Sequence, residues 1–454
     1  RYPESKIPNP DDYQSKVIEI IKPIMEDSSI PKTGQNVKFD ALILMRLGVR
    51  VRGLKFDTMI AAHLLKPELR SIKLDNLSKE YLDYAMIPIT DLIGTGRNQI
   101  TMAEVELDKA SFYAAEDADI ALQLTLIFEK KLEDEKLLSF FNEVELPLIP
   151  VLLEMEFKGM YVDEQLLNEM SSDFGKKIDS LTKGIYNESG FEFNVNSTQQ
   201  LAKILFDVKG LPEIKKRSTA EDVLEQLKGK HILPEMVLEF RKLNKLKNTY
   251  IDALPELINQ SSGRIHSTFN QAMTATGRLS SSNPNFQNIP IKTQEGREIR
   301  KAFRSSDPNW LIFSADYSQI ELRIMAHLSQ DEALVDAFNK GVDIHATTAA
   351  SVFNVSIDEV EPSMRRTAKI VNFGLLYGAG PFRMSQELGI PQKEAKSLIE
   401  AYFATYAGIK NYVDSMMDFA KENRFVTTLL GRKRPVWDID SSNHLHREAA
   451  KRMA

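Results

Sequence analysis

The residue with the clearest capacity for chemistry is Asp316, a carboxylate that directly follows an apolar run. This run, Trp310 to Ala315, has the pattern of a buried β-strand. An acid at the end of a rigid strand is well placed to bind a divalent cation, because such ions need fixed oxygen ligands. An aspartate here could equally cap the helix expected from Ile320 onward. Its role therefore depends on the residues around it.

A second candidate site is a face of a predicted helix that carries cations and then aromatic rings. Residues four apart on a helix drift by only about 40° per step, so Arg365, Lys369, Phe373 and Tyr377 form one stripe. Cations suit the phosphates of a nucleoside triphosphate, and aromatic rings suit its sugar and base. The structural alternative is an amphipathic helix with a snorkelling basic end and a core aromatic end.

Both patterns resemble the motifs of family A DNA polymerases, the DNA polymerase I family. The eight residues from Asp316 to Arg323 match motif A without a mismatch. The stripe, followed by Gly378, matches motif B, R-x-x-x-K-x-x-x-F-x-x-x-Y-G. The resemblance implies a template-directed DNA polymerase that extends a primer 3′-hydroxyl with dNTPs. It also implies two Mg²⁺ ions as cofactors, with Mn²⁺ able to replace them.

The resemblance assigns roles to individual residues of these motifs. Asp316 and the backbone carbonyl of Tyr317 are expected to bind the metal ions, and Glu321 to exclude a ribonucleotide 2′-hydroxyl. Lys369 is expected to be catalytic, by neutralising the triphosphate. Phenylalanine at position 373 implies discrimination against dideoxynucleotides. The nucleotide-binding candidates are Gln319, Glu321, His345 of an Asp-Ile-His triplet, Arg365, Lys369, Phe373 and Tyr377.

Further polar segments resemble the parts of the family that hold primer-template DNA. Residues 274–281 and 283–290 carry Arg, Asn and Gln side chains, which can contact minor-groove acceptors that every base pair offers. Basic runs at 209–217 and 241–247 suit a phosphate grip, although solvated helix faces are equally consistent with them. The DNA-binding candidates are Arg278, Asn285, Gln287, Asn288, Ser218, Thr219, Lys245 and Arg452.

Two segments near the start of the chain, 34–40 and 113–119, resemble the second and third motifs of the family's 3′→5′ exonuclease. Tyr113 and Asp117 are four apart and share a helix face, where they could orient a water and bind a metal together with Asp40. The family's first motif, Asp-x-Glu on an initial strand, is absent from the sequence. We therefore expect an exonuclease remnant without proofreading, in which Asp57 is structural.

The pattern of elements predicts a mixed α/β protein with two domains. Short apolar stretches at 41–47 and 54–60, interpreted as strands, alternate with helical segments, and long helices are expected at 108–132 and 143–162. We expect an incomplete RNase H-like exonuclease domain followed by a right-hand polymerase domain that lacks the C-terminal palm hairpin. The expected divisions are 1–135 for the exonuclease-like domain, 136–454 for the polymerase domain, about 160–265 for the thumb, 266–328 for a partial palm, 329–445 for the fingers and 446–454 for the start of a returning palm helix.

Both ends of the sequence lead us to expect a trimmed or split chain. It begins with Arg1 rather than Met, and after Arg447 it contains no His-Asp-Glu hairpin, which supplies the family's second metal-binding aspartate. Two-metal phosphoryl transfer needs convergent carboxylates. We therefore expect a separate C-terminal fragment to complete the palm, and the chain alone to be inactive or incomplete.

Composition narrows the partners and the compartment. With 58 Lys and Arg against 64 Asp and Glu, the net charge is −6, so DNA must be met by local basic clusters. There is no cysteine, which excludes disulfides and thiolate metal sites. No apolar run is long enough to span a membrane and no signal peptide is recognisable. We expect primer-template DNA and dNTPs as partners, in the cytoplasm of a bacterial or phage-infected cell or in a DNA-containing organelle.

Two other functions remain open at this point. A single-subunit RNA polymerase shares the metal-binding aspartate and a basic-aromatic helix, although Glu321 and the exonuclease remnant argue against it. A non-catalytic DNA-binding or scaffolding fragment is favoured by the two incomplete metal motifs.

Overall fold

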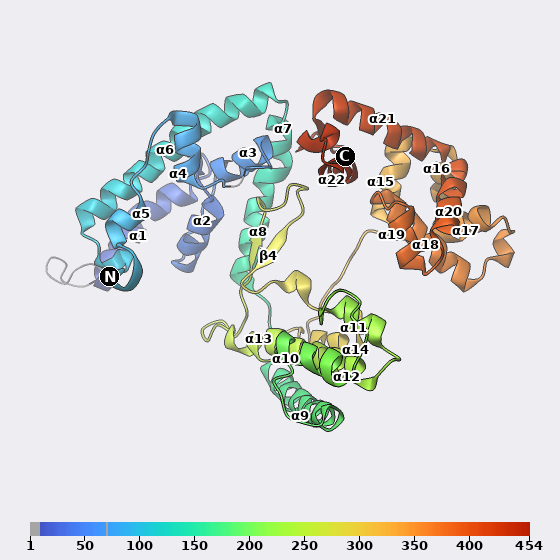
Figure 1. The fold of residues 1–454 in the computed structure, drawn as a ribbon. Coiled ribbons are helices and arrows are strands. Elements are labelled where there is room, and N and C mark those ends of the chain that lie inside the picture. Colours follow the sequence, from blue (N-terminus) through green and yellow to red (C-terminus); the bar gives the residue numbers. More distant parts are fainter. Residues whose placement is uncertain (1–9, 70) are drawn as a thin grey trace.

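The computed structural model describes residues 10–69 and 71–454, which form three lobes around a central hairpin (Figure 1). The N-terminal lobe is blue to cyan, the second lobe is green, and the C-terminal lobe is orange to red. The expectation tied to Arg1 lies outside the described residues.

The N-terminal lobe is built on one parallel β-α-β unit. Strand β1 (Lys32–Gly34) pairs in parallel with β2 (Leu54–Asp57), and α2 (Val37–Arg46) makes the crossover. The predicted strand at 54–60 is thus partly confirmed, whereas the one predicted at 41–47 is wrong because most of it lies in α2. The other helices are α1 (Pro10–Glu26), α3 (Thr58–Leu65), α4 (Leu74–Leu82), α5 (Ile89–Ile93) and α6 (Leu107–Asp134), with single turns at Gly96–Asn98 and Met102–Glu104.

Helix α6 holds the core of this lobe and continues toward the centre of the molecule. Its buried face, which includes Leu124 and Phe128, packs with Phe56 and Phe141. The chain then passes through α7 (Leu138–Phe140), a π-turn (Phe141–Glu145) and α8 (Leu146–Lys158). Helix α8 ends at Gly159, where φ is +61° and a Cβ would lie 2.7 Å from the Ile265 carbonyl oxygen. Both long helices predicted from the sequence are confirmed.

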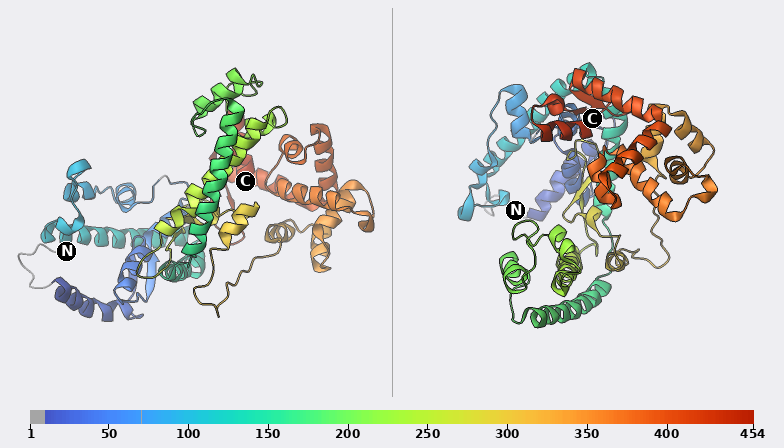
Figure 2. Two further views of the ribbon diagram at one scale, coloured as in Figure 1. Left: turned by 90° about the horizontal axis from the view of Figure 1, so that it is seen from below. Right: turned by 45° about the vertical axis from the view of Figure 1, so that its right-hand side comes forward.

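The second lobe is helical and projects away from the rest of the chain (Figure 2). Its long helix α9 (Glu164–Ser189) packs against α12 (Ile232–Leu246), with Ile185 and Val237 fully buried in the shared core. The shorter elements are α10 (Thr198–Ala202), a π-turn (Lys203–Val208), α11 (Glu221–Leu227), a second π-turn (Lys247–Ile251) and α13 (Ala253–Glu256).

The central hairpin connects the lobes. Strand β3 (Thr268–Asn270) runs antiparallel to β4 (Ser280–Ser282), with Phe269 opposite Ser281. A short turn (Phe286–Asn288) and α14 (Gln294–Arg300) follow.

The strand predicted at Trp310–Ala315 is wrong. The segment is coil, and Leu311 and Phe313 are 93% and 89% exposed. A strand needs a neighbour to satisfy its backbone N–H and C=O groups, and no described strand pairs with this segment. The apolar pattern is therefore present without the partner that would turn it into a strand.

The C-terminal lobe is mostly helical, as predicted from Ile320 onward. Its core includes Leu322, Val371, Tyr402 and Tyr406. Within the described ranges, no helix is both long and apolar enough to cross a membrane. The elements are α15 (Ile320–Ser329), α16 (Glu332–Asn339), α17 (Ile344–Phe353), a single turn (Ile357–Glu359), α18 (Pro362–Leu376), α19 (Pro381–Leu388), α20 (Gln392–Thr405), α21 (Ala407–Asn423), the antiparallel strands β5 (Phe425–Thr427) and β6 (Lys433–Pro435), a single turn (Trp437–Asp440) and α22 (His444–Met453).

Candidate functional site

Helix α18 carries the predicted stripe of cations and rings. Proline at its first position starts the helix, since the missing N–H would have no partner there. Tyr377 is the C-terminal cap, and Gly378 follows with φ of +70°. Lys369, Phe373 and Tyr377 line one hollow of about 510 Å³, together with Arg366, Ile370, Gly374, Arg383 and Glu387. Thus the last three residues of the stripe share one cavity, which is basic at the Lys369 end and aromatic at the Tyr377 end. Its wall also includes an acid, Glu387, which is paired with Arg383 at 2.9 Å.

Arg365, the first residue of the stripe, is turned toward the neighbouring helix α17. Its Nε donates a 2.7 Å hydrogen bond to Asp343 Oδ2, while Asp343 Oδ1 caps α17 by accepting from the backbone N–H of His345 at 2.9 Å. Partial burial favours a higher pKa for Asp343, but the bonds from Arg365 and the backbone outweigh it and lower the pKa. In this structure Arg365 therefore fixes α17 against α18.

His345 lies behind the stripe, against Phe373. The two ring centroids are 5.7 Å apart, and Nδ1 of His345 lies 3.0 Å from the Asn372 amide nitrogen. Burial lowers the pKa of His345; Asp343 opposes this shift, and the charges of Arg365 and Lys369 add to it. A neutral imidazole with Nδ1 accepting from Asn372 fits this arrangement.

The motif A residues lie in two different environments. Asp316 and Tyr317 are in exposed coil, and the chain turns at Gln319, which has a left-handed φ of +53° and precedes α15. Glu321, in the first turn of α15, accepts a 3.4 Å hydrogen bond from the hydroxyl of Tyr377. This contact joins the helices of motifs A and B. Within the described residues no hydrogen bond or ion pair joins Asp316 to Lys369.

Four of the candidate primer-template residues lie in the central hairpin and in the short turn that follows it. Arg278, Asn285, Gln287 and Asn288 are all exposed. Gln287 Nε2 donates to the Leu279 carbonyl at 3.0 Å, which ties the two polar segments together, and Asn285 caps the short turn through the Gln287 N–H. Local hydrogen bonds thus hold Asn285 and Gln287 in place, while all four side chains remain accessible to solvent.

The thumb candidates cluster only in part. Ser218 and Thr219 line a hollow of about 710 Å³ with Arg217 and Arg241, and Arg241 donates to the Thr219 carbonyl at 2.5 Å. Lys245 lies exposed on α12. The basic runs are largely engaged with nearby acids or backbone, as in the pairs Arg217–Asp207, Lys215–Asp222 and Lys247–Asp252.

Arg452 lies far from the thumb, against the end of motif B. A Cβ placed on Gly378 would meet Arg452 Cγ at 3.3 Å, so α22 packs onto the turn that follows α18. Arg452 is exposed. Its predicted DNA contact would therefore be made beside the face of α18 that carries Lys369, Phe373 and Tyr377.

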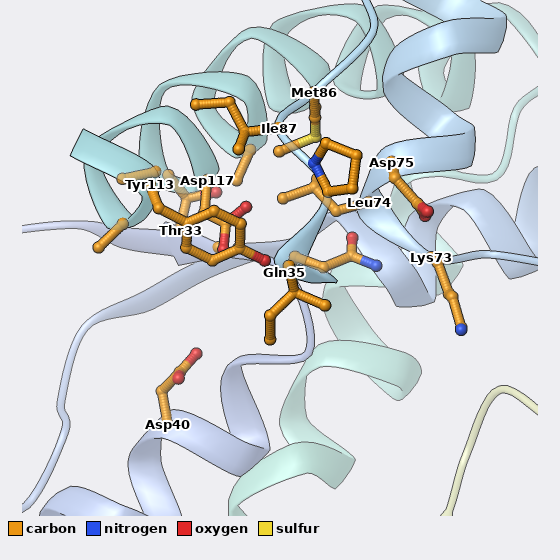
Figure 3. Close-up of a pocket in the computed structure, with 16 residues that line it drawn as sticks. Thr33, Gln35, Asp40, Lys73, Leu74, Asp75, Met86, Ile87, Tyr113 and Asp117 are labelled. Atoms are coloured by element: carbon orange, nitrogen blue, oxygen red, sulfur yellow. The ribbon is translucent and has the colours of Figure 1, made fainter. Parts of the chain in front are cut away.

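The exonuclease-like residues share one pocket in the N-terminal lobe. Asp40 of α2 and Tyr113 and Asp117 of α6 line a hollow of about 640 Å³ (Figure 3). Burial raises the pKa of Asp40. Burial also raises the pKa of Asp117, with smaller contributions from the charges of Glu116 and Asp40, which places the two aspartates within electrostatic reach of each other. The described residues contain no group of three acidic or histidine side chains that could hold a metal ion.

Asp57, expected to be structural, is a fully buried helix cap. Its carboxylate accepts hydrogen bonds from the backbone N–H groups of Asn36, Val37, Met59 and Ile60, at 2.9 to 3.2 Å. Burial raises the pKa of Asp57 to about 6 even though these four bonds oppose the shift.

Sequence reasoning missed several residues that hold the site together. Asp343 was noted only as part of the Asp-Ile-His triplet, and its role as a cap could have been recognised, because an aspartate directly before a helix is a frequent cap. Asn372 and the buried pair Glu145 and Arg432 gave no local signal, since their partners lie far away in the sequence.

Comparison with known proteins gives a consistent result over the whole chain. Residues 164–454 match the profile of DNA polymerase family A, and residues 4–133 match that of a 3′-5′ exonuclease. The chain is 42% identical over 447 residues to DNA polymerase I of Pseudomonas aeruginosa (96% of this chain, 49% of that protein). It is 43% identical over 451 residues to DNA polymerase I of Chloroflexus aurantiacus (97% of this chain, 47% of that protein). The chain thus spans about half the length of these curated relatives.

A solved structure is also similar. It is the POL domain of Pol1 from M. smegmatis in complex with a DNA primer-template and dNTP, with a TM-score of 0.84 and 35% sequence identity. The match covers 98% of this chain and 74% of that one.

Proposed function

Because the chain belongs to DNA polymerase family A, we propose that it forms the nucleotide-selecting and DNA-gripping part of a template-directed DNA polymerase. The reaction is attack of a primer 3′-hydroxyl on the α-phosphorus of a dNTP, with release of pyrophosphate. The hydrogen bond between Glu321 and Tyr377 carries the proposal. It joins the first turn of α15, which follows Asp316 closely in the sequence, to the face of α18 that carries the cations and rings.

In this proposal each part of the α18 face meets a different part of the nucleotide. Lys369 is exposed at the basic end of the hollow and forms a charge-assisted contact with the triphosphate. Phe373, backed by His345, presents an apolar surface to the sugar and base. Glu321, held by Tyr377, occupies the space that a 2′-hydroxyl would need, so the site prefers dNTPs.

Polymerases of this family use divalent metal ions, but the described residues fit a two-metal site only in part. Mg²⁺ prefers oxygen ligands. Here these are the Asp316 carboxylate and the Tyr317 carbonyl, both in exposed coil. Two ions need more than one carboxylate. We propose that residues outside these 454 supply the second one, in the same polypeptide or in a separate fragment.

Primer extension tests the proposal. The 454-residue chain and the longest polypeptide encoded by its gene would be assayed on a primed template with Mg²⁺ and each dNTP, with rNTPs in parallel. We expect the longer polypeptide to extend the primer with dNTPs and the shorter chain to bind DNA with little or no extension. Normal extension by the short chain would refute the missing-carboxylate proposal. Preferred use of rNTPs would favour an RNA polymerase, and DNA binding without extension by both polypeptides would favour a scaffold.

We also propose that these residues alone do not proofread. Asp40, Asp75 and Asp117 line the N-terminal pocket, but the described residues contain no group of three acidic or histidine side chains that could hold a metal ion, whereas a two-metal nuclease site needs such convergent ligands. The chain should therefore leave a mispaired 3′ end intact in Mg²⁺.

The proposed division into an exonuclease-like domain (1–135) and a polymerase domain (136–454) rests on the turn between α6 and α7. We propose that the protein acts in the bacterial cytoplasm, because its proposed substrates are DNA and dNTPs and its relatives include bacterial proteins.

A further inference from the structure

A buried polar cluster at the centre of the molecule joins three segments that are far apart in the sequence. It consists of Glu145 at the start of α8, Gln271 after β3, and Arg432 in the turn before β6, which are 4%, 7% and 6% exposed. Arg432 Nη2 donates to Glu145 Oε1, and Gln271 Nε2 donates to the Glu145 carbonyl oxygen at 2.8 Å and to Oε2. Figure 1 shows the C-terminal segment beside α7 and the upper end of α8.

The cluster borders the loop that carries Arg278. At Gly277 of this loop φ is +77°, and a Cβ would lie 2.8 Å from Arg432 Nε, so only glycine allows the guanidinium to approach this closely. The same loop begins next to Gln271, and His63 Nε2 lies 3.1 Å from its Thr274 carbonyl oxygen. The loop is therefore held at its start by Gln271 and packed against Arg432 at its tip.

Stability alone does not account for this arrangement. Arg432 Nη1 is buried and has no hydrogen-bond partner within the described residues, and one face of the guanidinium lies over the Phe140 ring, 5.4 Å from its centroid. A buried ion pair with an unsatisfied donor is weak evidence for stabilisation, because removing both charges from water costs free energy that the pairing must offset. What the pair does provide is a fixed arrangement of α8, the loop and the hairpin of β5 and β6.

We propose that Glu145 and Arg432 are positioning residues that hold the loop at 274–279 in the conformation that binds primer-template DNA. The inference rests on the proposed function, since it assigns this loop a DNA contact. The effect reaches Arg278 through the loop, because the adjacent Gly277 packs against Arg432 and Thr274 Oγ1 donates to the Arg278 carbonyl at 2.6 Å. The effect reaches Gln287 through its bond to the Leu279 carbonyl.

The inference predicts a specific split between DNA and nucleotide binding. Arg432 borders the DNA-contacting loop and does not line the hollow under α18. Loss of the ion pair should therefore weaken DNA binding and leave KM for dNTP, measured at saturating DNA, unchanged. A general structural defect would change both quantities.

The test uses the longest polypeptide encoded by the gene and a fluorescent primer-template. For Arg432→Gln we expect about a 10-fold rise in Kd for DNA, since small displacements of positioning groups have effects of this order or larger. Arg432→Lys, which keeps the charge, should recover part of the affinity. The Glu145→Gln/Arg432→Gln double variant should bind about as tightly as either single variant, because the two residues act as one unit.

Two matched controls separate positioning from general damage. Lys433→Gln breaks the neighbouring ion pair of the same hairpin, with Glu135, which is more exposed than the Glu145–Arg432 pair. Its Kd should change by less than about 2-fold. Gly277→Ala pushes the loop off Arg432 without changing either charge, and Gly263→Ala, which also has a positive φ but open space around it, is its control.

The outcomes distinguish the inference from the proposed function. The inference stands if Arg432→Gln and Gly277→Ala weaken DNA binding and speed amide hydrogen exchange at 274–279 relative to their controls. It fails if both bind DNA as their controls do, and also if KM for dNTP rises in parallel with Kd. Failure of the unmodified protein to bind primer-template would instead refute the proposed function. If Arg432→Gln does not fold, Gly277→Ala against Gly263→Ala decides the question.

Discussion

The hollow beside α18 and the pocket of the N-terminal lobe are lined mainly by side chains of opposite charge. The first is lined by Arg366, Lys369 and Arg383 with one acid, Glu387, whereas the second is lined by Asp40, Asp75 and Asp117 with one lysine. A hollow rich in cations suits a polyanionic ligand, and a hollow rich in carboxylates suits a cation. The charges of the lining residues thus distinguish the proposed nucleotide site from the exonuclease-like pocket.

The electrostatics of the two sites support the same distinction. In the N-terminal pocket, burial raises the pKa of Asp40 and Asp117, and the neighbouring acids Glu116 and Asp40 raise that of Asp117 further. Beside α18 the acid Asp343 is compensated by Arg365 and its pKa is lowered. The acid beside α18 is thus paired with a cation, whereas burial dominates the pKa of the two acids of the N-terminal pocket.

The largest expected effect comes from removing the one carboxylate that the polymerase side offers to metal. In the longest polypeptide, Asp316→Asn should lower kcat for extension by at least about 10³-fold, because the metal ions that activate the 3′-hydroxyl lose a ligand. Single-turnover extension measures it. Asp358→Asn, an exposed acid of the same lobe, is the control. Intact extension by Asp316→Asn would remove the distinction between the two sites.

The next effect concerns an acid beside the N-terminal pocket and its dependence on pH. Asp57 has a pKa of about 6 when folded against an ordinary value of 3.8, so the folded state binds the proton more tightly. Its contribution to stability is therefore fully present below about pH 4 and is lost as pH rises through 6, by up to about 3 kcal/mol. Asp57→Asn cannot titrate, so the free energy of unfolding of the unmodified protein should fall relative to this variant across that window.

Chemical unfolding from pH 4 to 7, followed by a probe in the N-terminal lobe, measures this difference. Asp83→Asn is the control, because Asp83 is exposed and its left-handed φ of +53° suits asparagine. A constant difference between the unmodified protein and Asp57→Asn across the window would contradict the raised pKa of this acid.

A smaller effect is expected from the cation of the nucleotide face. Lys369→Met should lower kcat/KM for dNTP by roughly 10- to 100-fold, since one charge-assisted contact to the triphosphate is lost. Lys396→Met, at an exposed position of α20 in the same lobe, should have no effect on this constant. Steady-state kinetics at saturating DNA compare the two. Equal kinetics for both variants would mean that α18 does not bind the triphosphate.

The sequence predicted the parts of the site that depend on local periodicity. The stripe on α18 follows from steps of four along a helix, and the structure confirms the helix and a shared hollow for Lys369, Phe373 and Tyr377. The long helices α6 and α8 were predicted for the same reason, since apolar spacing and a terminal glycine are local signals.

The errors and omissions concern partners that local patterns do not specify. The run at 310–315 has a strand pattern, but a strand forms only where another lies beside it. The run at 41–47 is short and apolar, and such runs fit a helix as well as a strand. Glu145 and Arg432 are 287 residues apart, so no spacing rule could pair them.

The smallest expected effect tests the link between motifs A and B. The bond from Tyr377 Oη to Glu321 is 3.4 Å long and involves exposed side chains, so it is weaker than a short charged hydrogen bond. Tyr377→Phe keeps the ring and removes only this bond. We expect kcat/KM for dNTP to fall by no more than about 5-fold, and the preference for dNTP over rNTP to decrease, because Glu321 is then less firmly held.

Glu321→Gln and the double variant complete a thermodynamic cycle for this bond. If Tyr377 acts through Glu321, the double variant should discriminate against rNTPs no worse than Glu321→Gln alone. Single-nucleotide incorporation of matched dNTP and rNTP measures both constants. Fully additive losses would mean that the two residues act independently. The contact would then reflect only the proximity of the two helices, and the nucleotide face would have to be explained by α18 alone.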